Sequence, residues 1–297
     1  MDHYARPQRL VRVNRRRRLN LLDTGEGGPT VVLAAGFLGG TLDWGYVQHR
    51  LSKSRRVVSF DTAGLGFSDP GPLPRTSTAI VQDLRTTLAN AGIAPPYILV
   101  GHSAGGLRMH LFAAMHPEEV VGLVLVDSVQ PDWQQRLEAV GSPGIAPEQD
   151  ILRRLLALAT AGELHPQSPE YIARIGLPRG GLSPAVNQAL HEMWVRPSYL
   201  RTALSESRYL RASSDHEVRA YARGLGDLPL VVLTAGQAAQ MPALAGLPGA
   251  RVWQAMHEEL AALSSRGVQR VIDCGHNIPV ERPDAVVAAV EDVAAMA

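Results

Sequence analysis

The pentapeptide Gly101-His102-Ser103-Ala104-Gly105 has the pattern G-x-S-x-G, in which one residue separates a serine from a glycine on each side. An apolar run at residues 97–100 precedes it, and a helical pattern at residues 106–116 follows. A serine on such a sharp strand-to-helix turn has close backbone neighbours, which is why the flanking positions are glycines. The turn would lift the Ser103 hydroxyl to the carboxyl edge of a sheet, beside a helix N-terminus. These features predict that Ser103 is a nucleophile.

A serine hydroxyl is a weak nucleophile by itself and needs a base within hydrogen-bond reach. Of the 10 histidines, His276 stands out because it follows a predicted strand, lies next to Gly275 and comes late in the chain. We therefore expect His276 to be this base. His102 neighbours Ser103 in the sequence, but adjacent residues on this turn point apart, so His102 should pack beside the site.

The rest of the chain must position these residues, and it alternates short β-branched runs with longer helical patterns. This order is typical of an α/β fold with a mostly parallel sheet and crossover helices. Most of the runs are apolar throughout, as expected of strands that are covered on both faces. Strands are predicted at residues 30–34, 56–60, 97–100, 121–126, 230–234 and 269–272, an edge hairpin at 10–13 and 19–22, and helices at 78–91, 106–116 and 283–295.

The alternation stops after Val126. Residues 129–227 contain no convincing strand, but they contain helical patterns at 151–161, 185–195 and 199–212. A structureless loop of this length between two buried strands is uncommon in a compact domain. We therefore predict a core domain of residues 1–128 and 228–297, with a helical cap (lid) inserted at residues 129–227.

Several motifs in this order resemble the α/β-hydrolase family over nearly all of the chain outside the predicted cap. Residues 31–40 resemble the first core strand and oxyanion loop of that family, residues 61–68 its D-x-x-G-x-G-x-S turn, and residues 275–279 the turn that carries its catalytic histidine. The resemblance implies the α/β-hydrolase fold, a Ser-His-acid triad and no cofactor. It also implies that Asp61, Gly64, Gly66 and Ser68 brace a turn near the site.

The resemblance leaves the identity of the triad acid open. Many members carry it in a G-x-x-D context after the strand that follows the cap, but residues 234–240 here hold no carboxylate. Some lipases and dehalogenases carry it at the end of the strand before the cap, where this chain has Asp127. There a carboxylate could bind the Nδ1–H of His276 and fix its tautomer, or it could simply cap a helix. We take Asp127 as the expected acid and Asp273 as the alternative.

The resemblance further implies two backbone donors for the developing oxyanion. One is the N–H of Ala104, and the other comes from the loop at residues 35–40, where Phe37 is the expected donor and Leu38 the alternative. Where relatives carry His-Gly, this chain has Ala35-Gly36. That difference removes a side chain that commonly braces the loop, but it leaves the backbone donor in place.

The substrate pocket is defined less sharply. Leu38 and His102 are candidates to line it, and large side chains of the predicted cap could either line it or pack between cap and core. These cap residues are Trp133, Met193, Trp194, Tyr199 and Tyr209. Cys274 is expected to be a small buried thiol. We find no phosphate-binding loop and no His/carboxylate cluster with metal-ligand spacing, so neither cofactor nor metal is expected.

Composition narrows the classes of protein further. The 297 residues are 45% hydrophobic and 19% charged, with a formal net charge of +1, so nothing favours nucleic acid or a membrane as a partner. The basic run at residues 15–18 is expected in a turn or at a strand end. A single cysteine excludes an intramolecular disulfide. No apolar stretch resembles a signal peptide or a membrane span, which predicts a cytoplasmic protein. A monomer or a homodimer is expected.

Together these features predict a serine hydrolase that cleaves esters of small to medium apolar acyl groups through an acyl-enzyme. A lactonase, a thioesterase, an amidase, or a cofactor-free perhydrolase or lyase would use the same triad. Serine at this turn argues against an epoxide hydrolase or a haloalkane dehalogenase, because relatives of those types need an aspartate there. A ligand-binding receptor with little turnover and a structural scaffold are the alternatives from other classes.

Overall fold

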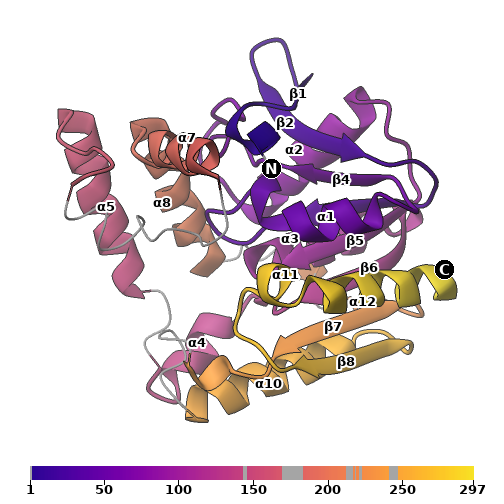
Figure 1. Ribbon diagram of the computed structural model, residues 1–297. Helices are drawn as coiled ribbons and strands as arrows, with labels where there is room; N and C mark the ends of the chain where they lie inside the picture. The colour runs from indigo at the N-terminus through magenta and orange to yellow at the C-terminus, as the bar shows by residue number, and fades with distance from the viewer. Residues whose placement is uncertain are drawn as a thin grey trace.

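The computed structural model describes residues 2–142, 146–168, 183–211, 217, 219–220, 223–240 and 247–297. These residues form an eight-stranded sheet in the order β1-β2-β4-β3-β5-β6-β7-β8 (Figure 1). The strands are β1 (Arg9–Arg12), β2 (Arg18–Thr24), β3 (Thr30–Ala34), β4 (Val57–Phe60), β5 (Tyr97–His102), β6 (Val120–Val126), β7 (Leu230–Ala235) and β8 (Gly267–Ile272). β2 pairs antiparallel with β1 and β4, and the other pairs are parallel, which confirms the predicted fold class.

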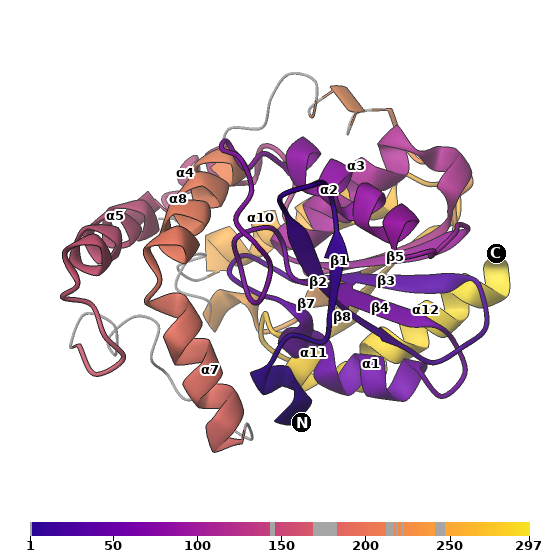
Figure 2. The same cartoon turned by 90° about the horizontal axis from the view of Figure 1, so that it is seen from above.

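Helices cover both faces of the sheet (Figure 2). One face is covered by α2 (Ser77–Asn90), α3 (Ala104–Met115), α4 (Trp133–Glu138) and α10 (Leu247–Ala261), and the other by α1 (Gly45–Leu51), α11 (Ile278–Glu281) and α12 (Pro283–Met296). In α12 the spacing of Val286, Val290 and Val293 places all three on one face, and each is fully buried against the sheet. Short 3-10 helices lie at η1 (Asp2–Ala5), η2 (Thr41–Trp44), η3 (Pro117–Glu119) and η4 (Ala238–Gln240).

The segment between β6 and β7, which we call the insertion, contributes three helices beyond the strand ends: α5 (Ala146–Ala161), α7 (Pro184–Trp194) and α8 (Pro197–Arg211) (Figure 1). They share an apolar cluster with Leu65, against which Phe37 and Leu38 also pack. The fourth described helix of the insertion, α4, packs against α10 instead. Parts of the predicted cap, residues 143–145, 169–182, 212–216, 218 and 221–222, lie outside the described residues, and its boundaries stay a prediction.

The strands and helices named from the sequence occur within five residues of their predicted bounds, with the largest difference at the start of α5. β8 differs from the other predicted parallel strands because it is an edge strand of the sheet. Its Val268 and Val271 are 45% and 55% exposed. Helix α10, which lies between β7 and β8, was not among the predicted elements, and neither were the shorter helices α1, α4 and α11. The basic run covers the turn between β1 and β2 and the first residue of β2, and the Asn14 side chain accepts from two backbone N–H groups in this turn. None of the described helices has the length and apolar character needed to cross a bilayer.

Candidate active site

Ser103 occupies the tight turn between β5 and α3. Its backbone has φ +53° and ψ −120°, a conformation that is strained for a residue with a Cβ. A Cβ at Gly101 would collide with the carbonyl of Gly105, and one at Gly105 would collide with the carbonyl of Ala34. The two glycines of the pentapeptide are therefore required by backbone packing.

Asp127 lies beside Ser103 at the same sheet edge, because β5 and β6 pair in register with His102 opposite Val126. Its fully buried carboxylate accepts three hydrogen bonds, each from a different part of the fold. His276 Nδ1 donates at 2.6 Å, the Ala235 N–H at 2.8 Å and Trp253 Nε1 at 2.9 Å. The aspartate thus joins the loop after β8 to β7 and α10.

These donors keep Asp127 ionised. Burial raises the pKa of the carboxyl, but the hydrogen bond from His276 and the neighbouring imidazoles outweigh it and lower the pKa to about 2. An ionised carboxylate on Nδ1 fixes the tautomer in which Nε2 is free to accept a proton.

Asp273, the alternative acid, does not contact His276 through a hydrogen bond. Its exposed carboxylate accepts from Gln237 Nε2 at 3.1 Å. The geometry therefore pairs His276 with Asp127, the carboxylate expected at the end of the strand before the insertion.

His102 holds the backbone of His276. Its Nε2 lies 2.8 Å from the His276 carbonyl oxygen, and the two rings lie 4.6 Å apart between centroids. Burial lowers the pKa of His102 to about 4, so the ring is neutral near pH 7 and donates from Nε2. Among the described residues no hydrogen bond joins Ser103 Oγ to His276; in free enzymes such bonds are often long and tighten when substrate binds.

Helix α10 supplies two residues that the sequence analysis missed. Trp253 donates to Asp127, and His257, four residues later on the same face, lies with Nδ1 3.8 Å from Asp127 Oδ1. His257 Nε2 lies 2.9 Å from the Ser128 carbonyl, and its Nδ1 lies 3.0 Å from the hydroxyl of Thr234. Burial lowers the pKa of His257, which favours the neutral ring. The W-x-x-x-H spacing before the last strand is the pattern that could have pointed to them.

Cys274 is 5% exposed. Burial raises the pKa of its thiol to about 11, so the thiolate is scarce at neutral pH. The thiol is therefore buried and weakly nucleophilic, as the sequence indicated.

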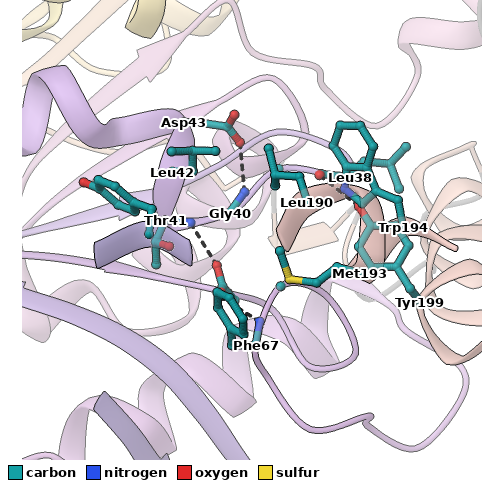
Figure 3. A pocket seen from close by; sticks show the side chains of 14 residues that line it. Leu38, Gly40, Thr41, Leu42, Asp43, Phe67, Leu190, Met193, Trp194 and Tyr199 are labelled. Atoms are coloured by element: carbon teal, nitrogen blue, oxygen red, sulfur yellow. Dashed lines mark hydrogen bonds between the residues drawn. The ribbon is translucent and has the colours of Figure 1, made fainter. Parts of the chain in front are cut away.

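The expected oxyanion loop, residues 35–40, lies against Ser103. A Cβ at Gly36 would stand 3.2 Å from Ser103 Cβ. Leu38 adopts φ +62°, and its carbonyl accepts from the hydroxyl of Tyr199 on α8 at 3.1 Å (Figure 3). Ala104 is the first residue of α3, where a backbone N–H has no acceptor within the helix. Both expected donors thus come from segments next to Ser103.

Asp61 joins this loop to the turn at residues 61–68. Its buried carboxylate accepts from the N–H of Thr41 at 2.9 Å and from that of Phe67 at 3.1 Å, and Asn20 Nδ2 donates at 2.9 Å. Ser68 Oγ donates to the Asp61 carbonyl at 2.6 Å. Burial raises the pKa of Asp61 despite these donors. These bonds brace the turn, as the resemblance implied.

A small cavity borders the oxyanion loop and contains about 30 Å³, room for about one water (Figure 3). Leu38 and Trp194 line it, together with Met193 and Tyr199. Trp133 lies elsewhere: it is 5% exposed and packs edge-on against Trp253, with ring centroids 6.3 Å apart. This packing favours the structural alternative for Trp133.

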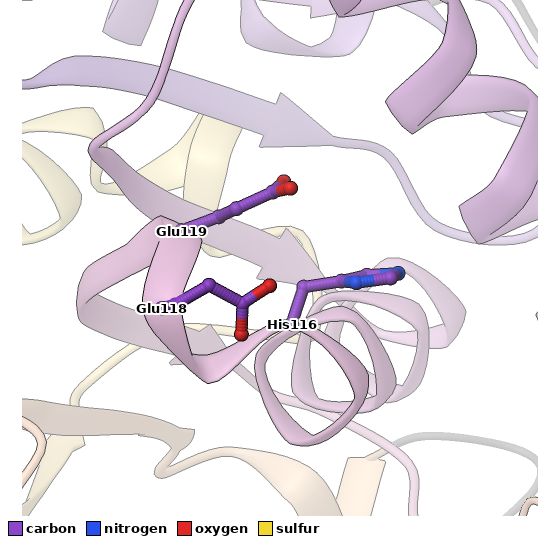
Figure 4. Close-up of side chains that lie close together, drawn as sticks. All are labelled: His116, Glu118 and Glu119. Carbon is purple, nitrogen blue, oxygen red and sulfur yellow. The ribbon is translucent and has the colours of Figure 1, made fainter.

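Within the described residues, one group of side chains that was not identified from the sequence has metal-ligand spacing: His116, Glu118 and Glu119 (Figure 4). His116 follows the C-terminal end of α3, the helix whose N-terminus adjoins Ser103, so the group is remote from the site. Glu119 already accepts from Arg85 at 2.6 Å.

Comparison with known proteins identifies the family. The family model for alpha/beta hydrolases matches residues 31–289. The chain belongs to the α/β-hydrolase family. This membership confirms the resemblance and supports hydrolase chemistry.

Individual relatives are distant. YqjL of Bacillus subtilis is 24% identical over 271 residues, which cover 91% of this chain and 85% of that protein. The fold is similar to a thermophilic esterase from Thermogutta terrifontis (20% identity, TM-score 0.64, 98% of each chain) and to the epoxide hydrolase CorEH (17%, TM-score 0.64, 97% and 98%). Several other curated relatives share only about a third of this chain. At these identities the structural likeness shows the fold alone.

Proposed function

We propose that this α/β-hydrolase is a serine esterase, with Ser103 as nucleophile, His276 as base and Asp127 as the acid. The observation that carries the proposal is the hydrogen bond from His276 Nδ1 to the buried carboxylate of Asp127, 2.6 Å long, at the sheet edge that also bears the strained Ser103. A strained serine and an oriented imidazole from separate segments are the two parts that acyl transfer requires.

The proposed reaction has two steps. His276 Nε2 takes the proton of Ser103 as Oγ attacks the ester carbonyl, and the N–H groups of Phe37 and Ala104 stabilise the oxyanion. The alcohol leaves with the proton from His276, and an acyl-serine remains. Water then attacks the acyl-serine with the same base, releasing the carboxylic acid and restoring Ser103. No cofactor is needed for these steps.

Epoxide hydrolases share this fold, but the residue at the turn favours ester cleavage. An alkyl-ester intermediate needs a carboxylate nucleophile, whereas this chain has the hydroxyl of Ser103. Leu38 packs with Met193 and Trp194 in an apolar cluster next to the oxyanion loop, which favours an apolar over a charged acyl group.

The test is hydrolysis of p-nitrophenyl esters from acetate to decanoate, together with labelling of the protein by a fluorophosphonate. We expect wild type to hydrolyse the shorter members and to be labelled at Ser103. Ser103→Ala should lose both properties. Ser265→Ala, which removes an exposed hydroxyl remote from the sheet edge, should keep them.

Absence of both hydrolysis and labelling in wild type would overturn the proposal. Labelling without ester hydrolysis would leave the serine nucleophile in place and refute the ester substrate. A lactone and thioester panel would then identify the bond that is cleaved, since those alternatives use the same triad.

A further inference from the structure

Leu38 is held in an unusual conformation beside the nucleophile. Its φ of +62° lies in the left-handed region, which is unfavourable for a side chain with a Cβ. The hydroxyl of Tyr199 donates to its carbonyl at 3.1 Å, and Tyr199 itself is only 3% exposed. A hydrogen bond at this position opposes relaxation of Leu38 to negative φ, which would also move the adjoining Phe37 N–H.

Other polar restraints act at the far end of the loop. Asp43 accepts from the N–H of Gly40 at 2.8 Å, and Asp61 accepts from the N–H of Thr41 at 2.9 Å. Ala35, at the near end, offers only a methyl group. The carbonyl of Leu38 is thus the point at which a side chain from the insertion holds the middle of the loop.

Helix α8 is itself fixed to the core on the face that carries Tyr199. Thr202 and Glu206 follow Tyr199 by three and seven residues, so all three lie on one side of the helix. Glu206 accepts from Arg108 Nη2 at 2.7 Å, with side chains 0% and 2% exposed. A Cβ at Gly64 would collide with Thr202 Oγ1, so α8 touches the turn at residues 61–68.

Arg108 links the two proposed oxyanion donors through a series of contacts. It lies on α3 one turn after Ala104, which supplies one donor. From Arg108 the connection runs through Glu206 and α8 to Tyr199, and through its hydroxyl to Leu38. Phe37, the other donor, precedes Leu38 in the chain.

We propose that Tyr199 is a positioning residue for the oxyanion hole, and that the ion pair of Arg108 with Glu206 sets its place. The inference rests on the proposed function, because it assigns α8 a part in stabilising the transition state of acyl transfer. It makes the insertion more than a cover for substrate: one of its helices holds the loop that carries a proposed backbone donor.

The test compares Tyr199→Phe with wild type and with Tyr46→Phe, which removes the same hydroxyl from an exposed tyrosine on α1. Three quantities are measured: kcat and KM on the best p-nitrophenyl ester, the second-order rate of Ser103 labelling by a fluorophosphonate, and Tm. Labelling forms a Ser Oγ–P bond and expels fluoride, and the phosphoryl oxygen occupies the oxyanion hole. It therefore reports on that hole without depending on the ester.

We expect Tyr199→Phe to lower kcat about tenfold, the order set by one net hydrogen bond and less than the roughly 100-fold or more for a lost oxyanion donor. Labelling should slow by a similar factor while KM stays within about twofold, because the interaction matters in the transition state. Tyr46→Phe should match wild type in all three quantities.

Unchanged kcat and labelling in Tyr199→Phe, with an active wild type, would overturn this inference and leave the serine esterase intact. If kcat were unchanged, a lower Tm would assign Tyr199 to packing and a raised KM would assign it to substrate contact. Either outcome would also overturn the inference. A wild type that neither hydrolyses esters nor is labelled would overturn both proposals.

Discussion

The acid side and the oxyanion side of the proposed site are held by different parts of the molecule. Asp127 is fixed by donors from β7, from α10 and from the loop after β8, all in the body of the sheet and its covering helices. The oxyanion loop is held at Leu38 by Tyr199 of the insertion. One half of the site therefore depends on the core alone, and the other half also depends on α8.

This difference separates two kinds of change. A substitution that disturbs the position of α8 should weaken oxyanion stabilisation and leave the pairing of Asp127 with His276 intact. A substitution around Asp127 should weaken its pairing with His276 and leave oxyanion stabilisation intact. Sequence changes in the insertion would then alter the rate of acyl transfer as well as the substrate specificity.

The largest effect is expected from breaking the acid side at Asp127. Asp127→Asn removes the charge that fixes and stabilises the His276 imidazolium, so kcat should fall by about 1,000- to 10,000-fold with little change in Tm. Asp273→Asn is the matched control and should retain wild-type kcat, since that carboxylate is exposed and bound to Gln237. Comparable losses in the two variants would contradict the assignment of the acid.

A smaller effect should follow from breaking the anchor of α8. Glu206→Gln leaves the guanidinium of Arg108 buried without its carboxylate, so the free energy of unfolding should fall by about 3–5 kcal/mol in a urea titration. Replacing both partners by methionine removes the buried charges together and should recover most of that loss. A double variant no more stable than the single one would show that the pair itself contributes the stability.

The smallest effect should come from removing one donor on the acid side. Trp253→Phe keeps an aromatic ring beside Trp133 but withdraws the indole N–H from Asp127. Two donors remain, so kcat should fall only about 3- to 10-fold, and the free energy of unfolding by about 1–3 kcal/mol. Hydrolysis of the best p-nitrophenyl ester and calorimetry would measure the two changes. A loss as large as that of Asp127→Asn would mean that Trp253 has a further role.

The sequence located the strands and most helices well because their patterns are local. The apolar runs at residues 30–34 and 97–100 became β3 and β5, and the valine spacing of α12 became its buried face. The contribution of α10 to the site was missed because it depends on long-range contacts. Trp253 and His257 touch Asp127 and its neighbours, which lie more than a hundred residues earlier in the chain.

By itself the sequence determined the order of elements, the strained turn at Ser103 and the sheet edge at which chemistry can occur. Steric demands on the flanking glycines and the period of apolar residues are short-range, and they can be recognised without a structure. Only the tertiary structure decided that His276 pairs with Asp127 across 149 positions and that Tyr199 reaches Leu38 across 161. Such pairings depend on how the helices and strands pack in three dimensions, which no local pattern specifies.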